Sequence, residues 1–446
     1  MKIRLMGILK KKLDGGLNIF LKTILILLFF LFTKIVNSST ILDYQTEEFI
    51  KKINNLILSV NEYEKEINFK IILDKNPNAF VNQNNLMIIS SGLIEKSPSY
   101  ISFLAVLAHE IGHIEKMHII KRKSSINNLQ NINLLTNLSV LSGSLISNNT
   151  EIMSALALNQ LGISNFYLDF SKDQEREADH YSIETLKKLK LPYEPLVELL
   201  DILKNLAENR GFNSEFQKFS THPLYSERTN FVNNNKISNT LVDNELENEF
   251  QFIRSKFIGY SIENLNNINN SKKNFYSLYS EAIYYSRKGQ FKESLSKINN
   301  LIKKDNKNPY LLETKADILM SFGYKKEAIK FYEKVLELKP HNQYVKFLIF
   351  INLNNNDLNK NKKRIYFEKY KKLLFIFSTN QLLYLKYHQL SKDIGNKEWD
   401  IFFKLYFNKD NIKNSIYKNE LNLLYNEVDD DSLKKLIKLK LKAINI

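Results

Sequence analysis

Two histidines and a glutamate near residue 110 have the types and the spacing of a metal site. Residues 109–113 read His-Glu-Ile-Gly-His, which is the pattern H-E-x-x-H. Side chains four residues apart lie on one face of a helix, so His109 and His113 can bind one metal ion. Glu110, one step round the helix, then borders the open coordination position and can act as a general base on a metal-activated water.

The sequence around this motif predicts the helix that must position it. Apolar side chains recur at intervals of three and four residues: Ile101, Leu104, Leu107, Ala108 and Ile111. This periodicity predicts one long, partly buried helix with the motif near its middle. Histidines and a glutamate buried there need partners, and a metal ion is one. The alternative is that these residues have this spacing by chance on a solvated helix, or that the site has lost its function.

A second acidic segment offers the third ligand that a catalytic zinc site usually takes from its protein. Glu175 and Asp179 lie four residues apart, and Ser171 and Gln174 have the spacing that begins a helix. Glu175 can reach the metal. Asp179, one turn later, can accept the far ring N–H of a ligating histidine and fix its orientation. Taken alone, a solvated acidic helix face explains the same string.

The two segments together resemble a known family of zinc metalloproteases, which includes the BepA-type periplasmic proteases, HtpX and the mitochondrial Oma proteases. The resemblance rests on A-H-E-I-G-H at 108–113 and E-x-E-A-D at 175–179, and it covers about residues 43–254. It implies one zinc ion per chain. The implied ligands are His109, His113 and Glu175, and Glu110 is the implied base.

Two further segments bear on this resemblance. Ser220-Thr221-His222-Pro223 and Arg228 look like the family's S-T-H-P-x-x-x-x-R element. It implies that His222 covers the zinc as a latch or assists catalysis as a donor, while a plain loop residue is the alternative. Arg228 is expected to lie behind the metal ligands. The family's glycine-rich turn reads V-N-Q-N-N at 81–85 here, and asparagine tolerates the left-handed backbone of such a turn.

The strand after that turn is expected to bind substrate. Its residues are Leu86, Met87, Ile88 and Ile89. We expect this strand to form the edge of the cleft, where an extended substrate adds as a further strand through main-chain hydrogen bonds. That mode recognises backbone more than side chains, and it suits a protease that acts on unfolded or misassembled segments.

The N-terminal residues predict export. Basic residues precede the apolar run 24–32, and Val36-Asn37-Ser38 offers small residues for cleavage, so residues 1–38 are predicted to be a signal peptide. The expected compartment is the periplasm. An uncleaved membrane anchor and a start at Met6 are the alternatives. The chain has no cysteine, which excludes disulfides and thiolate metal ligands.

A chain of 446 residues with 43% hydrophobic residues is long enough for two cores. Residues 39–258 are predicted to form an α+β metalloprotease domain, mainly helical with a small sheet. Its predicted elements include a helix over 43–60, a strand over 67–73 and helical segments over 127–166 beside the cleft. Residues 259–274, which contain the run of Asn, Ser and Lys at 264–274, are predicted to be a linker.

Residues 275–446 are predicted to form an all-α domain of helical repeats. Four pairs of positions match at an offset of 34: Ala282 and Ala316, Gly289 and Gly323, Leu295 and Ile329, and Ile302 and Leu336. The pattern resembles tetratricopeptide repeats, with two clear units and a degenerate third from about residue 342. Irregular helical pairs are expected after it, closed by a lysine-edged helix over 433–444. A generic helical domain is the alternative.

The formal net charge of +16 does not predict nucleic-acid binding. Lysines are spread along the helices rather than clustered on a recognisable binding fold, and the short basic run at 360–364 fits a solvated face. Contact of the helix over 433–444 with an anionic membrane surface is a secondary expectation.

Two functions from different classes follow from these patterns. The first is an endopeptidase of the cell envelope that degrades misfolded or misassembled proteins. Its repeats would recruit those proteins or the outer-membrane protein assembly machinery, a partner that only the resemblance implies. The second is a repeat-based chaperone or assembly scaffold with a latched or vestigial zinc site.

Overall fold

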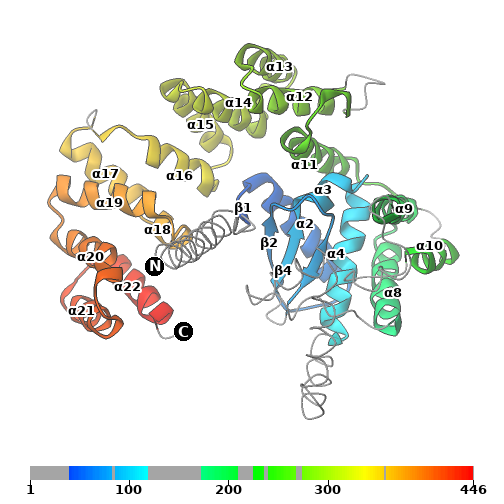
Figure 1. The fold of residues 1–446 in the computed structure, drawn as a ribbon, viewed down its shortest axis with the longest axis horizontal. Coiled ribbons are helices and arrows are strands. Elements are labelled where there is room, and N and C mark those ends of the chain that lie inside the picture. Colours follow the sequence, from blue (N-terminus) through cyan, green and yellow to red (C-terminus); the bar gives the residue numbers. More distant parts are fainter. Residues whose placement is uncertain are drawn as a thin grey trace, which may run out of the picture.

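A computed structural model describes residues 40–82, 86–118, 172–208, 225–235, 240–267, 274–355 and 358–444. Figure 1 shows a small sheet with helices packed around it, and a succession of helices that curves away from this part of the molecule. The fold is mostly helical with one small sheet. At that level it agrees with the predicted α+β domain and the helical region that follows it.

The sheet has four strands in the order β1-β2-β4-β3. The strands are β1 (Thr40–Ile41), β2 (Asn68–Ile72), β3 (Ala79–Val81) and β4 (Leu86–Ser90). β2 runs parallel to β4, and the two outer strands are antiparallel to their neighbours. The alternating apolar residues that predict β2 place Ile71 in the core, whereas Leu73 lies beyond the strand and is exposed.

The position of β4 contradicts one prediction from the sequence. Leu86, Met87, Ile88 and Ile89 were expected at the edge of the cleft, but β4 is paired with β2 on one side and with β3 on the other. No substrate strand can add to a strand whose two backbone edges are both occupied. The side chains of Met87 and Ile89 are also fully buried. The outer strand on this side is β3.

In the described part of the chain, seven helices pack around or beside the sheet. They are α2 (Tyr44–Val60), α3 (Ser91–Lys96), α4 (Tyr100–Glu115), α8 (Lys172–Lys188), α9 (Glu194–Glu208), α10 (Tyr225–Asn234) and α11 (Asn244–Ser261). Phe49 of α2, Phe103 of α4 and Phe250 of α11 meet in the core, and the ring of Phe250 lies 5.7 Å from Phe49 and 5.5 Å from Phe103. Such aromatic contacts hold α4 between its neighbours.

Residues 275–338 form two helical pairs with the same spacing. The pairs are α12 (Phe275–Arg287) with α13 (Phe291–Lys304), and α14 (Pro309–Ser321) with α15 (Lys325–Leu338). Each bound of the second pair lies 34 residues after its counterpart in the first (309 minus 275, 321 minus 287, 325 minus 291 and 338 minus 304). Gly289 and Gly323 turn the chain with φ of 74° and 86°, which glycine adopts readily. The period seen in the sequence is therefore present in the helices.

Helical pairs continue beyond residue 338 with less regular spacing. The helices are α16 (Gln343–Asn352), α17 (Lys360–Tyr370), α18 (Leu373–Ile376), α19 (Gln381–Ile394), α20 (Lys397–Asn408), α21 (Asn414–Glu427) and α22 (Asp431–Ile444). α16 begins 34 residues after α14 (343 minus 309), where the degenerate third unit is predicted. The fully buried Trp399 packs edge-on against Phe367 at 5.4 Å and anchors this core. The predicted final helix lies within α22.

Helix α11 joins the two parts of the molecule. Phe250 belongs to the core around the sheet, whereas Phe252 stacks on Tyr279 of α12 with ring centroids 4.2 Å apart. α11 continues to Ser261, so the first three residues of the predicted linker are helical. Residues 265–267 of that linker form a short 3-10 helix.

Several predicted features lie outside the described residues. They are the signal segment at 1–38, the turn residues 83–85, the helical segments at 127–166, Ser171 and His222. These predictions stay untested. Among the residues that the structure describes, no helix is both long enough and apolar enough to cross a bilayer.

Candidate metal centre

Helix α4 carries the H-E-x-x-H motif in its second half. The helix begins at a capping box in which the side chain of Ser99 accepts from the backbone of the first turn and Ser102 returns the contact. Glu247 of α11 accepts a hydrogen bond from the Ser99 hydroxyl at 2.6 Å, which ties this end of α4 to the core. α4 ends at Glu115, two residues after His113, so the motif lies nearer the C-terminal end than the sequence predicts.

Small residues let α8 approach α4 closely. A Cβ added at Gly112 would lie 3.2 Å from the Cα of Ala178 and 3.0 Å from the Cβ of Tyr181, so a larger side chain would push the helices apart. The Ser182 hydroxyl donates to the backbone carbonyl of Ala105 at 2.8 Å. The glycine of H-E-I-G-H and the alanine of E-x-E-A-D therefore set the distance between the two helices.

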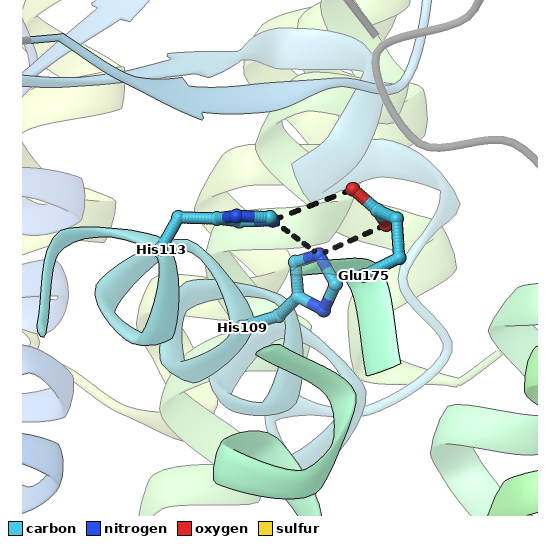
Figure 2. A group of neighbouring side chains, drawn as sticks. All are labelled: His109, His113 and Glu175. Carbon is cyan, nitrogen blue, oxygen red and sulfur yellow. Dashed lines mark hydrogen bonds and ion pairs between the residues drawn. The ribbon is translucent and has the colours of Figure 1, made fainter. Parts of the chain in front are cut away.

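This approach brings together the three predicted metal ligands. Figure 2 shows His109, His113 and Glu175 pointing toward one another from α4 and α8. The two Nε2 atoms lie 3.1 Å apart, and each lies 3.5 Å from an oxygen of Glu175. All three residues are buried, and among the described residues they are the one cluster whose ligand atoms fit a metal ion.

The donor set fits zinc. Ligand atoms at about 2.0–2.1 Å from a tetrahedral zinc ion lie roughly 3.3 Å from one another, close to the separations found here. Two imidazole nitrogens that face each other also need a proton or a cation between them. Two imidazoles and one carboxylate, with no thiolate, are the protein ligands of a common class of catalytic zinc site.

Asp179 and Arg228 support His109 from behind. Asp179 Oδ1 lies 2.8 Å from Nδ1 of His109, and Arg228 contacts both oxygens of Asp179 at 2.7 and 2.9 Å. The sequence led us to expect the contact of Asp179 with a ligating histidine, whereas the pairing of Asp179 with Arg228 is seen only in the structure. This arrangement holds the Nδ1 proton on the side away from the metal position, so Nε2 is the ligating atom.

The charges around His109 are strongly coupled. Burial raises the pKa of Asp179, but the Arg228 guanidinium and the contact with His109 outweigh it and lower that pKa to about 2. Burial and Arg228 lower the pKa of His109, whereas hydrogen bonds with Asp179 and Glu175 outweigh both and raise it. Asp179 is therefore an anion at all ordinary pH values, as a residue that orients a ligating imidazole should be.

The remaining predicted site residues have different outcomes. Glu110 is 1% exposed and lies on α4 beside His109, as its role as a base requires. His222 lies outside the described residues. The four predicted substrate-binding residues, 86–89, lie on β4, which is an interior strand of the sheet and not an edge strand.

The sequence reasoning missed one group of contacts at this site. His118 is not part of the ligand cluster. Its ring nevertheless lies against His113, with the two Nδ1 atoms 3.0 Å apart, and its Nε2 lies 2.9 Å from Glu177. No pattern in the sequence predicts this contact, because it depends on a left-handed residue after α4.

The fold and this cluster define a metallopeptidase-type site, in which a helix pair presents two histidines and a glutamate beside a buried acid. Residues 43–236 match the model of Peptidase family M48. The match spans α2 to α10 and includes all three side chains of the cluster. No curated protein matches the chain. The family match and the cluster support a metallopeptidase of the M48 type, and peptidases of that family are zinc-dependent.

Proposed function

We propose that this chain is a zinc-dependent endopeptidase that hydrolyses peptide bonds in unfolded or misassembled proteins. The observation that carries the proposal is the convergence of His109, His113 and Glu175 within a segment that matches Peptidase family M48. These three residues would hold the ion. Bound there, zinc supplies Lewis acidity and lowers the pKa of a bound water toward about 7.

The other site residues would handle the proton and the orientation of the ligands. Glu110 is buried and directly follows the ligand His109 in the sequence. Its carboxylate can therefore accept a proton from the attacking water and deliver it to the leaving amine. Asp179 and Arg228 hold the imidazole of His109 in one orientation throughout. His222 remains a proposed donor or latch.

Strand β3 is proposed to align the substrate in place of β4. It is an outer strand of the sheet and packs against α4, the helix that carries both histidines. An extended substrate that pairs with β3 would lie alongside that helix, with its main chain held by hydrogen bonds. Such binding depends little on sequence, which suits unfolded substrates.

The helical pairs after α11 are proposed to be tetratricopeptide-type repeats that recruit substrates or partners. The 34-residue spacing of their helix bounds supports this assignment. The proposed partner is the outer-membrane protein assembly machinery. The proposed compartment is the periplasm, reached through a signal peptide at residues 1–38. The partner rests on the family resemblance alone, and the compartment rests on the sequence of the N-terminal segment.

Zinc content and proteolysis, measured together on the full chain, test the proposed activity. The wild type should bind one zinc ion and cleave an unfolded protein such as reduced casein, and a chelator should abolish cleavage until zinc is restored. Glu110→Gln should keep the zinc and lose at least about 100-fold in rate, because it keeps the shape but not the base. If the wild type cleaves no faster than Glu110→Gln, the chaperone or scaffold function replaces the enzyme.

A further inference from the structure

The end of helix α4 contains an unusual backbone conformation. Met117 has a φ of 58°, a left-handed conformation that costs a residue with a Cβ about 1 kcal/mol or more relative to glycine. Its side chain is more than half exposed, so core packing does not hold Met117 in place. The next residue is His118, whose ring lies against His113 of the helix that has just ended. Backbone strain next to a ligand cluster indicates that the returned residue has a use there.

His118 is buried at the point to which the turn returns it. Its side chain is 1% exposed, and its ring packs edge-on against His113 with centroids 5.1 Å apart. The Nδ1 atoms of the two rings lie 3.0 Å apart, within hydrogen-bond distance. On its other side, Nε2 of His118 lies 2.9 Å from Oε2 of Glu177 on α8.

These contacts determine which nitrogen of each ring carries the proton once His113 binds a metal. Nε2 of His113 faces the cluster and must offer its lone pair, so a neutral ring carries its proton on Nδ1. That N–H lies within hydrogen-bond distance of Nδ1 of His118, whose own proton is then on Nε2. Glu177 accepts it. The hydrogen bonds thus run in one direction, from His113 through His118 to the carboxylate.

We propose that His118, supported by Glu177, is a positioning residue that fixes the tautomer and ring orientation of His113 for metal binding. The two ligating histidines then have matching supports. His109 donates directly to Asp179, and His113 donates to an imidazole that a carboxylate orients in turn. This inference rests on the proposed function, because it takes His113 as a ligand of the zinc ion.

The two supporting residues should not contribute equally. The side chain of Glu177 is 54% exposed, so water can replace much of its contact with His118. His118 is buried, and its removal takes this acceptor from the Nδ1 proton of His113 at a place that is also buried. Removal of His118 should therefore weaken metal binding more than removal of the Glu177 charge.

The affinity of the full chain for zinc, measured by competition with a chromogenic chelator, tests this inference. His118→Phe fills the space without an acceptor and should raise the Kd for zinc about 10- to 100-fold. His118→Asn places its Oδ1 near the position of Nδ1 and should stay within about threefold of the wild type. Glu177→Gln should fall between them. A matched control is His388→Phe, which removes a histidine that pairs with Asp400 in the repeat region and should leave the Kd unchanged.

Two results would overturn the inference. One is a wild-type Kd for His118→Phe, and the other is equal weakening by the Phe and Asn variants, which would indicate packing rather than an acceptor. Thermal unfolding of the zinc-free variants shows whether each one folds, and if His118→Phe does not, the Asn and Gln variants decide. If the wild type binds zinc tightly but cleaves nothing, the proposed function fails while this inference stands.

Discussion

At the scale of single residues, the site is organised by hydrogen bonds behind the ligands. Asp179 is buried as an anion, and Arg228 and His109 are its partners. A buried charge that loses its partner destabilises a protein much more than the intact pair stabilises it. The contribution of Arg228 should therefore be visible in protein stability even without a metal ion.

We predict that Arg228→Leu destabilises the zinc-free protein by about 3 kcal/mol, because it leaves the charge of Asp179 buried with one partner fewer. Arg228→Leu combined with Asp179→Asn should recover part of that loss, because no charge then remains to be paired. Denaturant unfolding with a chelator present measures both. Arg176→Leu is the matched control, since its contact with Asp173 is exposed and should change stability by no more than about 0.5 kcal/mol. An equal loss in the single and the double variant would contradict this account.

Spacing together with the family resemblance was enough to find the residues that converge on the metal position. His109 and His113 share a helix face by periodicity, and Glu175 and Asp179 share another, but the choice of Glu175 as a ligand came from the resemblance. His118 could not be found in this way. Its contact with His113 requires α4 to end after Glu115 and Met117 to adopt a left-handed conformation, which methionine does not favour. Only the structure shows that Met117 adopts this conformation.

At the scale of secondary structure, the outer strand of the described sheet decides where a substrate can align. Ser90 donates its backbone N–H to the carbonyl of Asn78, and Asn82 donates to that of Leu86, so alternate residues of β3 face β4. Phe80 is one of the residues whose backbone groups are directed to β4. Ala79 and Val81, which lie between, direct their backbone groups to the outer edge.

We predict that an extended substrate uses alternate amides to pair with β3. In peptides matched in sequence, N-methylation of every second amide should raise KM about 10-fold or more, because each lost hydrogen bond is replaced by a clash with the strand. Methylation of the amides between them should leave KM within about twofold. The modified positions should lie at least two residues from the cleaved bond, so that kcat reports no direct effect on chemistry. A KM that rises equally at every position would rule out pairing with a strand.

The order of the strands could not be predicted from the sequence, whereas the 34-residue period of the helical pairs could. The run at 86–89 is apolar throughout, and such a run fits a buried strand as well as an edge strand. Strand β3 has only three residues, too few to show a pattern of alternation. The pairs at 275–338 repeat every 34 residues, so their glycines and alanines reinforce one another. A repeated local pattern is a stronger signal than a contact between neighbouring strands.

At the scale of the whole molecule, polar side chains join the helical pairs to the domain that carries the site. Lys256 of α11 forms an ion pair with Asp43 at 2.8 Å, just before α2. Tyr344 of α16 donates to Glu47 of α2. Glu313 and Asp317 of α14 also lie in the field of Lys256 and Asp43. Burial and repulsion from Asp317 raise the pKa of Glu313 to about 8.

This raised pKa makes the stability of the full chain depend on pH. Between about pH 4.5 and pH 8 the unfolded chain has lost the Glu313 proton while the folded chain keeps it, so this group makes folding less favourable as the pH rises through that range. Glu313→Gln carries no titrating proton, and its free energy of unfolding should decline less over the same range and exceed that of the wild type at pH 8. Denaturant unfolding of the full chain at a series of pH values measures the difference. Glu327→Gln, on the exposed face of α15, should follow the wild-type profile. Parallel profiles for the wild type and Glu313→Gln would contradict this prediction. They would show that Glu313 ionises in the folded chain as it does in the unfolded one.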